Sequence, residues 1–312
     1  MKEQFYKWWL DNGQRGRDYC LANCNIEGLT RWNVQKWLKD FRTKQHSIRI
    51  DEKAKSLAQE IKKYSYPAKQ EVTIIQAGCL HFPKHDEKFV GCLLQVAEYI
   101  KPDYGVLTGD IADNSKHSKH NTALSVLMTE ALKGKSTLRK FLQDFKSKCK
   151  SVKYIRGNHE AWIDDQKESN IELMYNSEFT VPKVLGFDDL EIDYFEDLWE
   201  YQDFVFKHGD SIATGDNAPK TEFFGELRNG ASSHTHRSGR YRHTTRTKQY
   251  VWYTTGCGCQ LNMWYKLKGK SKINSGWNHS FNVFKFIGKQ FQCTQVEVID
   301  GQCIYDNKLF IG

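Results

Sequence analysis

The sequence has no apolar run that approaches the roughly 20 residues a helix needs to cross a bilayer. Its first residues, MKEQFYKWWLDNGQ, lack the uninterrupted apolar region and the small-residue cleavage site of a secretory signal peptide. We therefore expect a cytoplasmic protein with no membrane partner. Thiols stay reduced in the cytoplasm, so the nine cysteines should be free or metal-bound, without a disulfide-linked partner.

Internal repeats and low-complexity segments are also absent. Of the 312 residues, 39% are apolar and 27% are charged, which is typical of a globular chain. The net charge of +8 is concentrated in three basic runs. Each run is compatible with a solvated surface or with binding to a polyanion such as nucleic acid. The runs span residues 31–49, 133–153 and 237–248.

Residues 1–45 have the apolar spacing of three short helices. Thr30 is a suitable N-cap for the third, in which Val34 and Leu38 share one face. This layout resembles a helix-turn-helix, whose last helix enters the DNA major groove, although many three-helix bundles bind no DNA. The residues expected on its outer face are polar or basic, and we predict that Arg31, Gln35 and Lys36 contact nucleic acid.

Residues 46–70 predict a helical linker ending at Pro67, followed by a main domain at 71–312. In this domain, β-type runs first alternate with helical patterns and then follow one another with few helices between them. The pattern predicts an α/β fold: a two-sheet β-sandwich flanked by helices. The β-type runs are 72–77, 104–108, 152–155, 203–207, 249–254, 281–287 and 291–299, and the helical patterns are 86–100 and about 120–148.

Side chains that can bind metals follow the β-type runs. Because α/β sheets build their sites at the carboxyl ends of strands, we expect these side chains to meet. One histidine in a loop is usually structural, but five such clusters in succession indicate a shared site. They are Cys79 and His81 in QAGCLHF, Asp110 and Asp113 in TGDIAD, Asn158, His159 and Glu160 in RGNHEAW, His208 in FVFKHGDS, and His234 and His236 in SSHTHRSG.

These motifs resemble those of the calcineurin-like metallophosphoesterases, whose pattern runs DxH, GDxxD, GNHE, a lone His and GHxH. TGDIAD and RGNHEAW match completely, and the order and approximate spacing match over residues 72–236. The segments WYTTGCGCQLNMWY and SGWNHSFNVFKF resemble phosphoesterases of phages and prophages, some of which carry an N-terminal helix-turn-helix. A phage-encoded protein would act in the host cytoplasm.

The resemblance implies two divalent metal ions (Mn, Fe or Zn) and a metal-bound water that attacks phosphorus. Asp110 would bridge the ions. His159 would act as the general acid, with Asp113 orienting its ring, while Arg156 and Glu160 would support the site. The first ion would also bind Cys79, His81 and His236, and the second Asn158, His208 and His234.

Two positions depart from the family pattern: Cys79 replaces its first Asp, and Ser233 replaces the Gly of GHxH. A thiolate favours zinc or iron over magnesium. Three interpretations of Cys79 remain open: a true ligand, an uncoordinated thiol beside a weakly held ion, or a sign of altered activity. Cys257 and Cys259 have C-x-C spacing, for which a tight turn is the simpler interpretation than a zinc site.

The predicted helix-turn-helix, the net charge of +8 and the run RSGRYRHTTRTK favour a phosphodiesterase or nuclease acting on DNA. Arg237, Arg240 and Arg242 would hold flanking phosphates, and Tyr241 could stack on a base. The alternatives are a phosphomonoesterase for proteins or nucleotides, a cyclic-nucleotide phosphodiesterase, and a catalytically altered DNA-binding protein.

Overall fold

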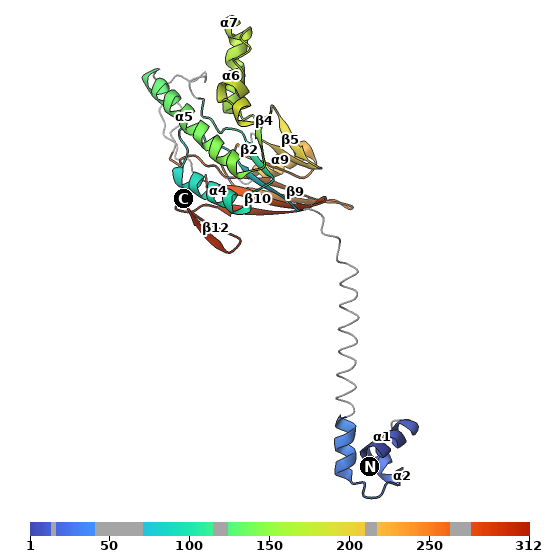
Figure 1. Cartoon of the computed structure of the whole chain (residues 1–312). Coiled ribbons are helices and arrows are strands. Elements are labelled where there is room, and N and C mark those ends of the chain that lie inside the picture. Colours follow the sequence, from blue (N-terminus) through green and yellow to red (C-terminus); the bar gives the residue numbers. More distant parts are fainter. Residues whose placement is uncertain (14–16, 41–70, 115–123, 210–216, 263–275) are drawn as a thin grey trace. The chain divides into compact units, whose positions relative to one another are not determined.

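The computed structural model describes the chain except for residues 14–16, 41–70, 115–123, 210–216 and 263–275 (Figure 1). It divides into two compact units, Met1–Ala68 and Lys69–Gly312. The linker helix predicted at 46–70 lies outside the described residues. Among the described helices, none combines the length and the apolar character needed to cross a bilayer.

The N-terminal unit contains α1 (Lys2–Asp11), α2 (Arg17–Asn23) and a helix at residues 31–40. The Thr30 hydroxyl accepts a hydrogen bond from the Asn33 amide, as an N-cap does. Phe5 and Val34 are fully buried where the helices meet. Three residues of the third helix predicted to bind nucleic acid are exposed on its surface, namely Arg31, Gln35 and Lys36.

The main unit is built on a six-stranded sheet with the order β11-β10-β1-β2-β3-β4. Strands β1 to β4 run parallel, and β10 and β11 are antiparallel additions at one edge. A parallel sheet covered on both faces requires apolar strands, which explains the runs read from the sequence. The bounds are β1 Glu71–Ala77, β2 Tyr104–Thr108, β3 Ser151–Ile155, β4 Ile192–Phe195, β10 Ser280–Ile287 and β11 Gln290–Glu297.

A second, five-stranded sheet has the order β5-β6-β7-β9-β8. It packs on the first through a shared apolar cluster that includes Ile74 and Phe284 of the first sheet and Phe204 and Phe206 of the second. The two sheets therefore form the predicted sandwich. The bounds are β5 Leu198–Tyr201, β6 Phe204–Lys207, β7 Gly230–Ser232, β8 Gly239–Thr244 and β9 Gln249–Thr254.

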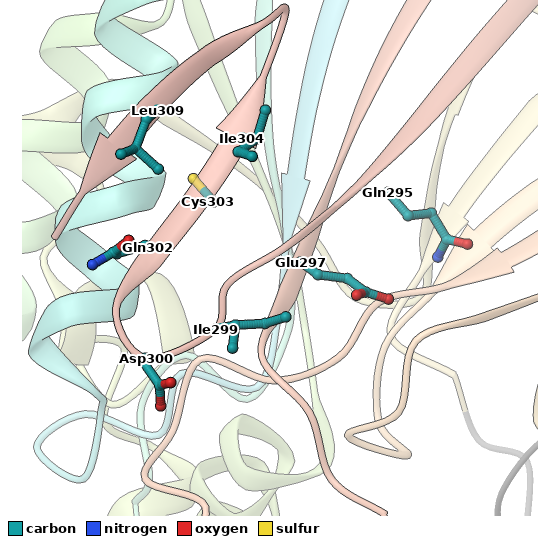
Figure 2. A pocket seen from close by; sticks show the side chains of 8 residues that line it. All are labelled: Gln295, Glu297, Ile299, Asp300, Gln302, Cys303, Ile304 and Leu309. Atoms are coloured by element: carbon teal, nitrogen blue, oxygen red, sulfur yellow. The ribbon is translucent and has the colours of Figure 1, made fainter.

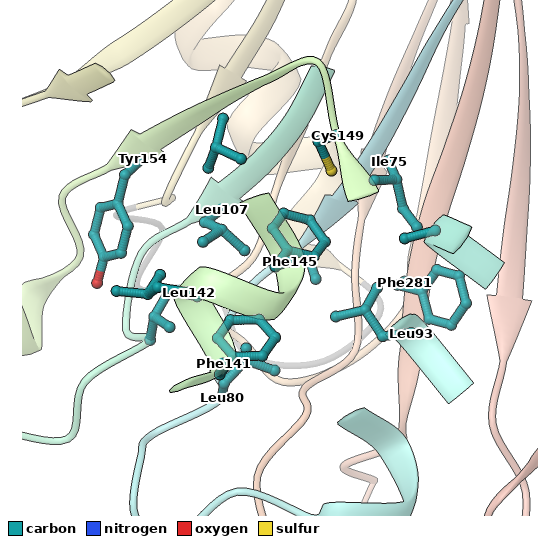
Figure 3. Close-up of a cluster of buried hydrophobic side chains, with 14 of the residues drawn as sticks. Ile75, Leu80, Leu93, Leu107, Phe141, Leu142, Phe145, Cys149, Tyr154 and Phe281 are labelled. Carbon is teal, nitrogen blue, oxygen red and sulfur yellow. The ribbon is translucent and has the colours of Figure 1, made fainter. Parts of the chain in front are cut away.

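Helices cover the outer faces of both sheets. On the first sheet, α4 (Glu87–Ile100) and α5 (Leu124–Lys148) bury Leu93, Phe141 and Phe145 against the strands (Figure 3). Each such side chain contributes about 1.5–3 kcal/mol relative to exposure. On the second sheet, α9 (Ala218–Glu226) packs through Phe223 on Trp252. The predicted fold class, a two-sheet α/β sandwich flanked by helices, is confirmed.

The remaining described elements lie around this sandwich. They are α6 (Asn158–Ser169), α7 (Ile171–Met174), α8 (Val181–Leu185), the 3-10 turn η2 (Asp188–Leu190), and a hairpin of β12 (Gln302–Tyr305) and β13 (Lys308–Ile311). α6 begins directly after β3, so its first residues stand at the carboxyl end of the parallel sheet, where the predicted site lies.

Candidate metal centre

The loops after β1, β2, β3, β6 and β7 bring the predicted ligands together. Five of these ligands have a left-handed backbone, with φ between 53° and 65°. Residues other than glycine rarely adopt this region, and each costs about 1–3 kcal/mol unless its surroundings fix it. Such strain clusters at functional sites. The five residues are Cys79, His81, Asp110, His234 and His236.

The first donor group lies at the end of β1. Nε2 of His81 is 3.2 Å from Nε2 of His236 and 3.9 Å from a carboxylate oxygen of Asp110. The Cys79 sulfur lies within 4.8 Å of ring nitrogens of both histidines. All four residues are buried. The four residues predicted for the first ion are therefore neighbours.

The second donor group surrounds His208. Its Nε2 is 3.1 Å from Oδ1 of Asn158, 3.1 Å from Nδ1 of His234 and 3.3 Å from Oδ2 of Asp110. Nδ1 of His234 is also 3.1 Å from Oδ1 of Asn158. Asp110 Oδ2 thus approaches both groups, as a bridging ligand would.

The donor chemistry of the second group fits a cation. Nδ1 of His208 donates to the carbonyl oxygen of Thr108 at 2.7 Å, so Nε2 is the ring nitrogen left to bind a cation. Nε2 faces two oxygens and another imidazole nitrogen, and a bound cation would replace the proton that it otherwise holds. Burial alone would lower the pKa of His208, but the Asp110 carboxylate outweighs it and raises the pKa to about 9. The position attracts positive charge.

The donors of the first group also suit a cation, but for a different reason. Burial, followed by the neighbouring His81, holds the pKa of His236 well below its ordinary value, so the ring stays neutral. Two imidazole nitrogens then face each other with a thiol and a carboxylate beside them. The set of nitrogen, oxygen and sulfur donors suits zinc or iron.

Glu160 fixes the loops that carry these ligands. Its buried carboxylate accepts hydrogen bonds from the amides of Asp110 at 2.8 Å and Gly157 at 2.9 Å, and from the Tyr154 hydroxyl at 2.6 Å. The amides of Ile111 and Ala112 donate to it as well. Gly157 must lack a side chain, because a Cβ atom there would lie 2.3 Å from the Asp110 nitrogen. Arg156, by contrast, pairs with Asp164.

His159 begins α6 beside the two groups. Its amide donates to Oδ1 of Asp110 at 2.9 Å, and its Nδ1 donates to the backbone carbonyl of Asp113. The Asp113 carboxylate lies 3.5 Å from Nδ1 of both His159 and His81, and Lys84 donates to it at 2.7 Å. Asp113 therefore contacts the expected acid and one expected ligand, and its carbonyl makes the closer contact with the acid.

The two departures from the family pattern have separate surroundings. The Ser233 hydroxyl hydrogen-bonds with the hydroxyls of Thr108 and Thr255, which joins the ends of three strands. It occupies space left by Gly78, where a Cβ atom would lie 2.1 Å from the Ser233 oxygen. Cys79 is fully buried, and this burial, together with the Asp110 carboxylate, raises the pKa of its thiol.

The basic residues after the last ligands lie on β8, an edge strand. Arg240 and Arg242 are exposed on one face of the strand, and Arg237 is half-buried next to His236. Tyr241 points to the opposite face and packs on Phe223, with ring centroids 5.6 Å apart. Tyr241 and the two exposed arginines therefore lie on opposite faces of β8, because neighbouring residues of a strand face opposite ways. The stacking of Tyr241 on a base stays a prediction.

A pair of cysteines lies close to this centre, and a pocket lies at another place in the main unit. A tight turn was the interpretation that the sequence favoured for Cys257 and Cys259. In the structure both cysteines approach His236, and their C-x-C spacing was the signal in the sequence that could have indicated a metal-binding group. A pocket at the β12–β13 hairpin contains none of the expected ligands (Figure 2). It is lined by Gln295, Glu297, Ile299, Asp300, Gln302, Cys303, Ile304 and Leu309.

A two-sheet sandwich with two donor groups that share one aspartate has the architecture of a metal-dependent phosphoester hydrolase. Residues 72–254 match the family of calcineurin-like phosphoesterases, and the chain belongs to that family. Members of the family typically bind two divalent metal ions. The resemblance to phage proteins and the helix-turn-helix assignment stay predictions.

Several solved structures are similar to this chain. Vps29 from Chaetomium thermophilum is 12% identical, with a TM-score of 0.41 over 77% of this chain and 98% of that chain. Purple acid phosphatase PPD1 from yellow lupin is 9% identical, with a TM-score of 0.45 over 77% and 54%. Nuclease MPE from Pseudomonas putida is 10% identical, with a TM-score of 0.30 over 71% and 87%. A search of curated proteins finds no match.

Proposed function

We propose that this protein is a dimetal phosphodiesterase that cleaves nucleic acid, with DNA as the favoured substrate. The observation that carries the hydrolytic part is the meeting of two donor groups at Asp110, with His159 bonded to the same carboxylate. Cys79, His81, Asp110 and His236 would hold the first ion. Asp110, Asn158, His208 and His234 would hold the second.

Bound divalent cations would acidify a water molecule and neutralise the phosphate oxygens. The chain supplies the proton for the leaving oxygen. His159 already donates its Nδ1 proton to Asp113, so to act as an acid its ring must take a second proton at Nε2. Burial, the largest effect, lowers the pKa of His159 below its ordinary value, and the carboxylates of Asp110 and Asp113 offset this only in part.

Three features support nucleic acid as the substrate. Arg240 and Arg242 are exposed on the strand that follows the last ligands, where they could bind flanking phosphates. The N-terminal unit exposes Arg31, Gln35 and Lys36 on one helix. The net charge of +8 favours association with a polyanion.

The test compares hydrolysis of bis-p-nitrophenyl phosphate, p-nitrophenyl phosphate, and single- and double-stranded DNA with Mn²⁺, Fe²⁺ or Zn²⁺. We expect the diester and DNA to be cleaved. Preference for the monoester would instead identify a phosphomonoesterase, which the same ligands could serve. Absence of cleavage under every condition would overturn the proposal. It would favour the alternative of a catalytically altered DNA-binding protein, in which Cys79 marks the altered site.

A further inference from the structure

Three buried sulfurs lie together behind the first donor group. The turn after β9 carries Cys257 and Cys259, and both pack against Cys79. The two turn sulfurs lie within 4.8 Å of each other and of a ring nitrogen of His236. All three thiols are free. A cluster of three thiols and one imidazole is the donor set of a closed zinc site.

The two ring nitrogens of His236 face different groups. Nε2 approaches Nε2 of His81 at 3.2 Å, whereas Nδ1 lies 3.9 Å from the Cys259 sulfur. Trp277 covers the ring, with centroids 3.9 Å apart. A histidine that binds metal through one nitrogen usually donates the other to an oxygen. Here the second nitrogen instead meets sulfur.

The turn that carries the thiols is held in place. The Gly258 amide donates to the Cys79 carbonyl at 3.1 Å, and the Cys257 amide donates to the Asn278 carbonyl at 2.9 Å. The Cys259 carbonyl accepts from Nε2 of His279 at 2.8 Å. Gly258 lies so close to Leu80 that a Cβ atom there would be 2.1 Å from its side chain. These contacts fix the backbone from which the sulfurs project.

We propose that Cys79, Cys257, Cys259 and Nδ1 of His236 form a cation site for a soft ion such as Zn²⁺ or Fe²⁺, adjoining the dimetal centre. With Nε2 on the first ion, the Nδ1 proton would be released to solvent on binding, as the thiol protons would be, and the ring would join the two sites as an imidazolate. Zinc–sulfur bonds of about 2.3 Å place tetrahedral sulfurs about 3.8 Å apart. The donor atoms of Cys257, Cys259 and His236 lie within 4.8 Å of one another, so they need move by only about an ångström, and Cys79 packs beside them. Cys79 adjoins both groups, and a thiolate sulfur has lone pairs enough to bind two cations. The site does not depend on the proposed hydrolytic activity.

The experiment loads the full chain with Co²⁺ and records the thiolate-to-cobalt charge-transfer absorption. The variants Cys257→Ser and Cys259→Ser should each lower zinc content by about one ion per chain and remove the part of this band that the adjoining site contributes. Cys293→Ser, which alters a partly buried thiol on β11, should change neither. An undiminished band in both turn variants would overturn the proposal.

A second measurement requires no substitution. Zinc K-edge X-ray absorption of the wild-type chain, loaded with one equivalent of zinc, should show sulfur as the predominant first-shell neighbour. A shell of nitrogen and oxygen with at most one sulfur would contradict the proposal. If the phosphoesterase proposal fails instead, hydrolysis will be absent while the band and the sulfur shell persist. The two failures are therefore distinguishable.

Discussion

Glu160 is a buried carboxylate that accepts hydrogen bonds from two separate loops. Its partners include the amide of Asp110, the residue that both donor groups share. Replacing the carboxylate with an amide would exchange one acceptor oxygen for an NH₂ group, a donor facing other N–H donors, at a cost of about 1–3 kcal/mol for each unsatisfied group. We expect Glu160→Gln to lower the free energy of unfolding by at least this amount and to reduce metal content, measured by urea denaturation and elemental analysis.

The exposed Glu168 on the same helix provides a matched control, because Glu168→Gln should alter neither quantity. Full metal content in the Glu160→Gln protein would show that the Asp110 loop holds its shape without this support.

His159 donates a hydrogen bond from its amide to Asp110, the residue that both donor groups share, and it belongs to neither predicted ligand set. We expect His159→Ala to reduce turnover of bis-p-nitrophenyl phosphate about 10²–10⁴-fold, the usual loss for a missing proton donor. Metal content should stay at the wild-type level. His243→Ala, on β8, should leave turnover unchanged and serves as the control. Wild-type turnover in the His159 variant would assign proton donation to another group.

The proximity of the expected ligands was predictable from the sequence because each follows a β-run, and strand ends of a parallel sheet meet in space. The hydrogen bonds of Glu160 were not predictable in the same way, since they join loops about 50 residues apart. The position of Asp113 between two imidazoles also required the folded structure, because the sequence indicates only that it lies near His159.

Asp103 joins β1 to the turn before β2. Its carboxylate accepts hydrogen bonds from the Thr73 amide at 2.8 Å and from Lys150 at 2.5 Å. Burial opposes ionisation, but these bonds outweigh it and lower the pKa of Asp103. Because the folded pKa lies below the unfolded value of about 3.9, the stabilisation is present above that pH and is lost as the pH falls towards the folded pKa.

We therefore expect Asp103→Asn to lower the free energy of unfolding by about 1–2 kcal/mol at pH 7. The difference from wild type should narrow as the pH falls below about 4, since the wild-type carboxyl then also becomes neutral. Urea denaturation at a series of pH values measures both quantities. A difference that stays constant over this range would assign the loss to packing rather than to charge.

Gly78 and Ser233 fit together where β1 and β7 end. A Cβ atom at position 78 would overlap the Ser233 hydroxyl, so Gly78→Ala should destabilise the protein by about 1–3 kcal/mol through overpacking. Adding Ser233→Gly removes the closest contact and should restore part of that loss. A double-mutant cycle by thermal denaturation measures the coupling. Additive effects of the two substitutions would contradict the proposed complementarity.

The apolar strands, including the four-residue β6, were predicted at nearly their observed bounds, whereas β7 and β8 were not. β7 consists of Gly230, Ala231 and Ser232, whose small side chains give no β-type signal, although this strand carries the last two histidines into the site. β8 reads as a basic run, and its alternating exposure follows from pairing with β9 rather than from apolar periodicity.

At the scale of the whole molecule, every expected metal ligand lies in the unit Lys69–Gly312. A chain lacking residues 1–68 should therefore retain its metals and its hydrolysis of bis-p-nitrophenyl phosphate. Its affinity for duplex DNA should fall, with a shallower dependence on salt because fewer phosphates are contacted. Fluorescence anisotropy at several salt concentrations tests this. Equal affinity with and without the N-terminal unit would exclude it from DNA binding.

The expected ligands come from both sheets: Cys79, Asp110 and Asn158 follow strands of the first, and His208 and His234 follow strands of the second. Any ion bound there would connect the two sheets of the sandwich. Metal binding and the relative position of the two sheets would then be coupled. Binding of the ions would stabilise the packing of the sheets and also complete the site for catalysis.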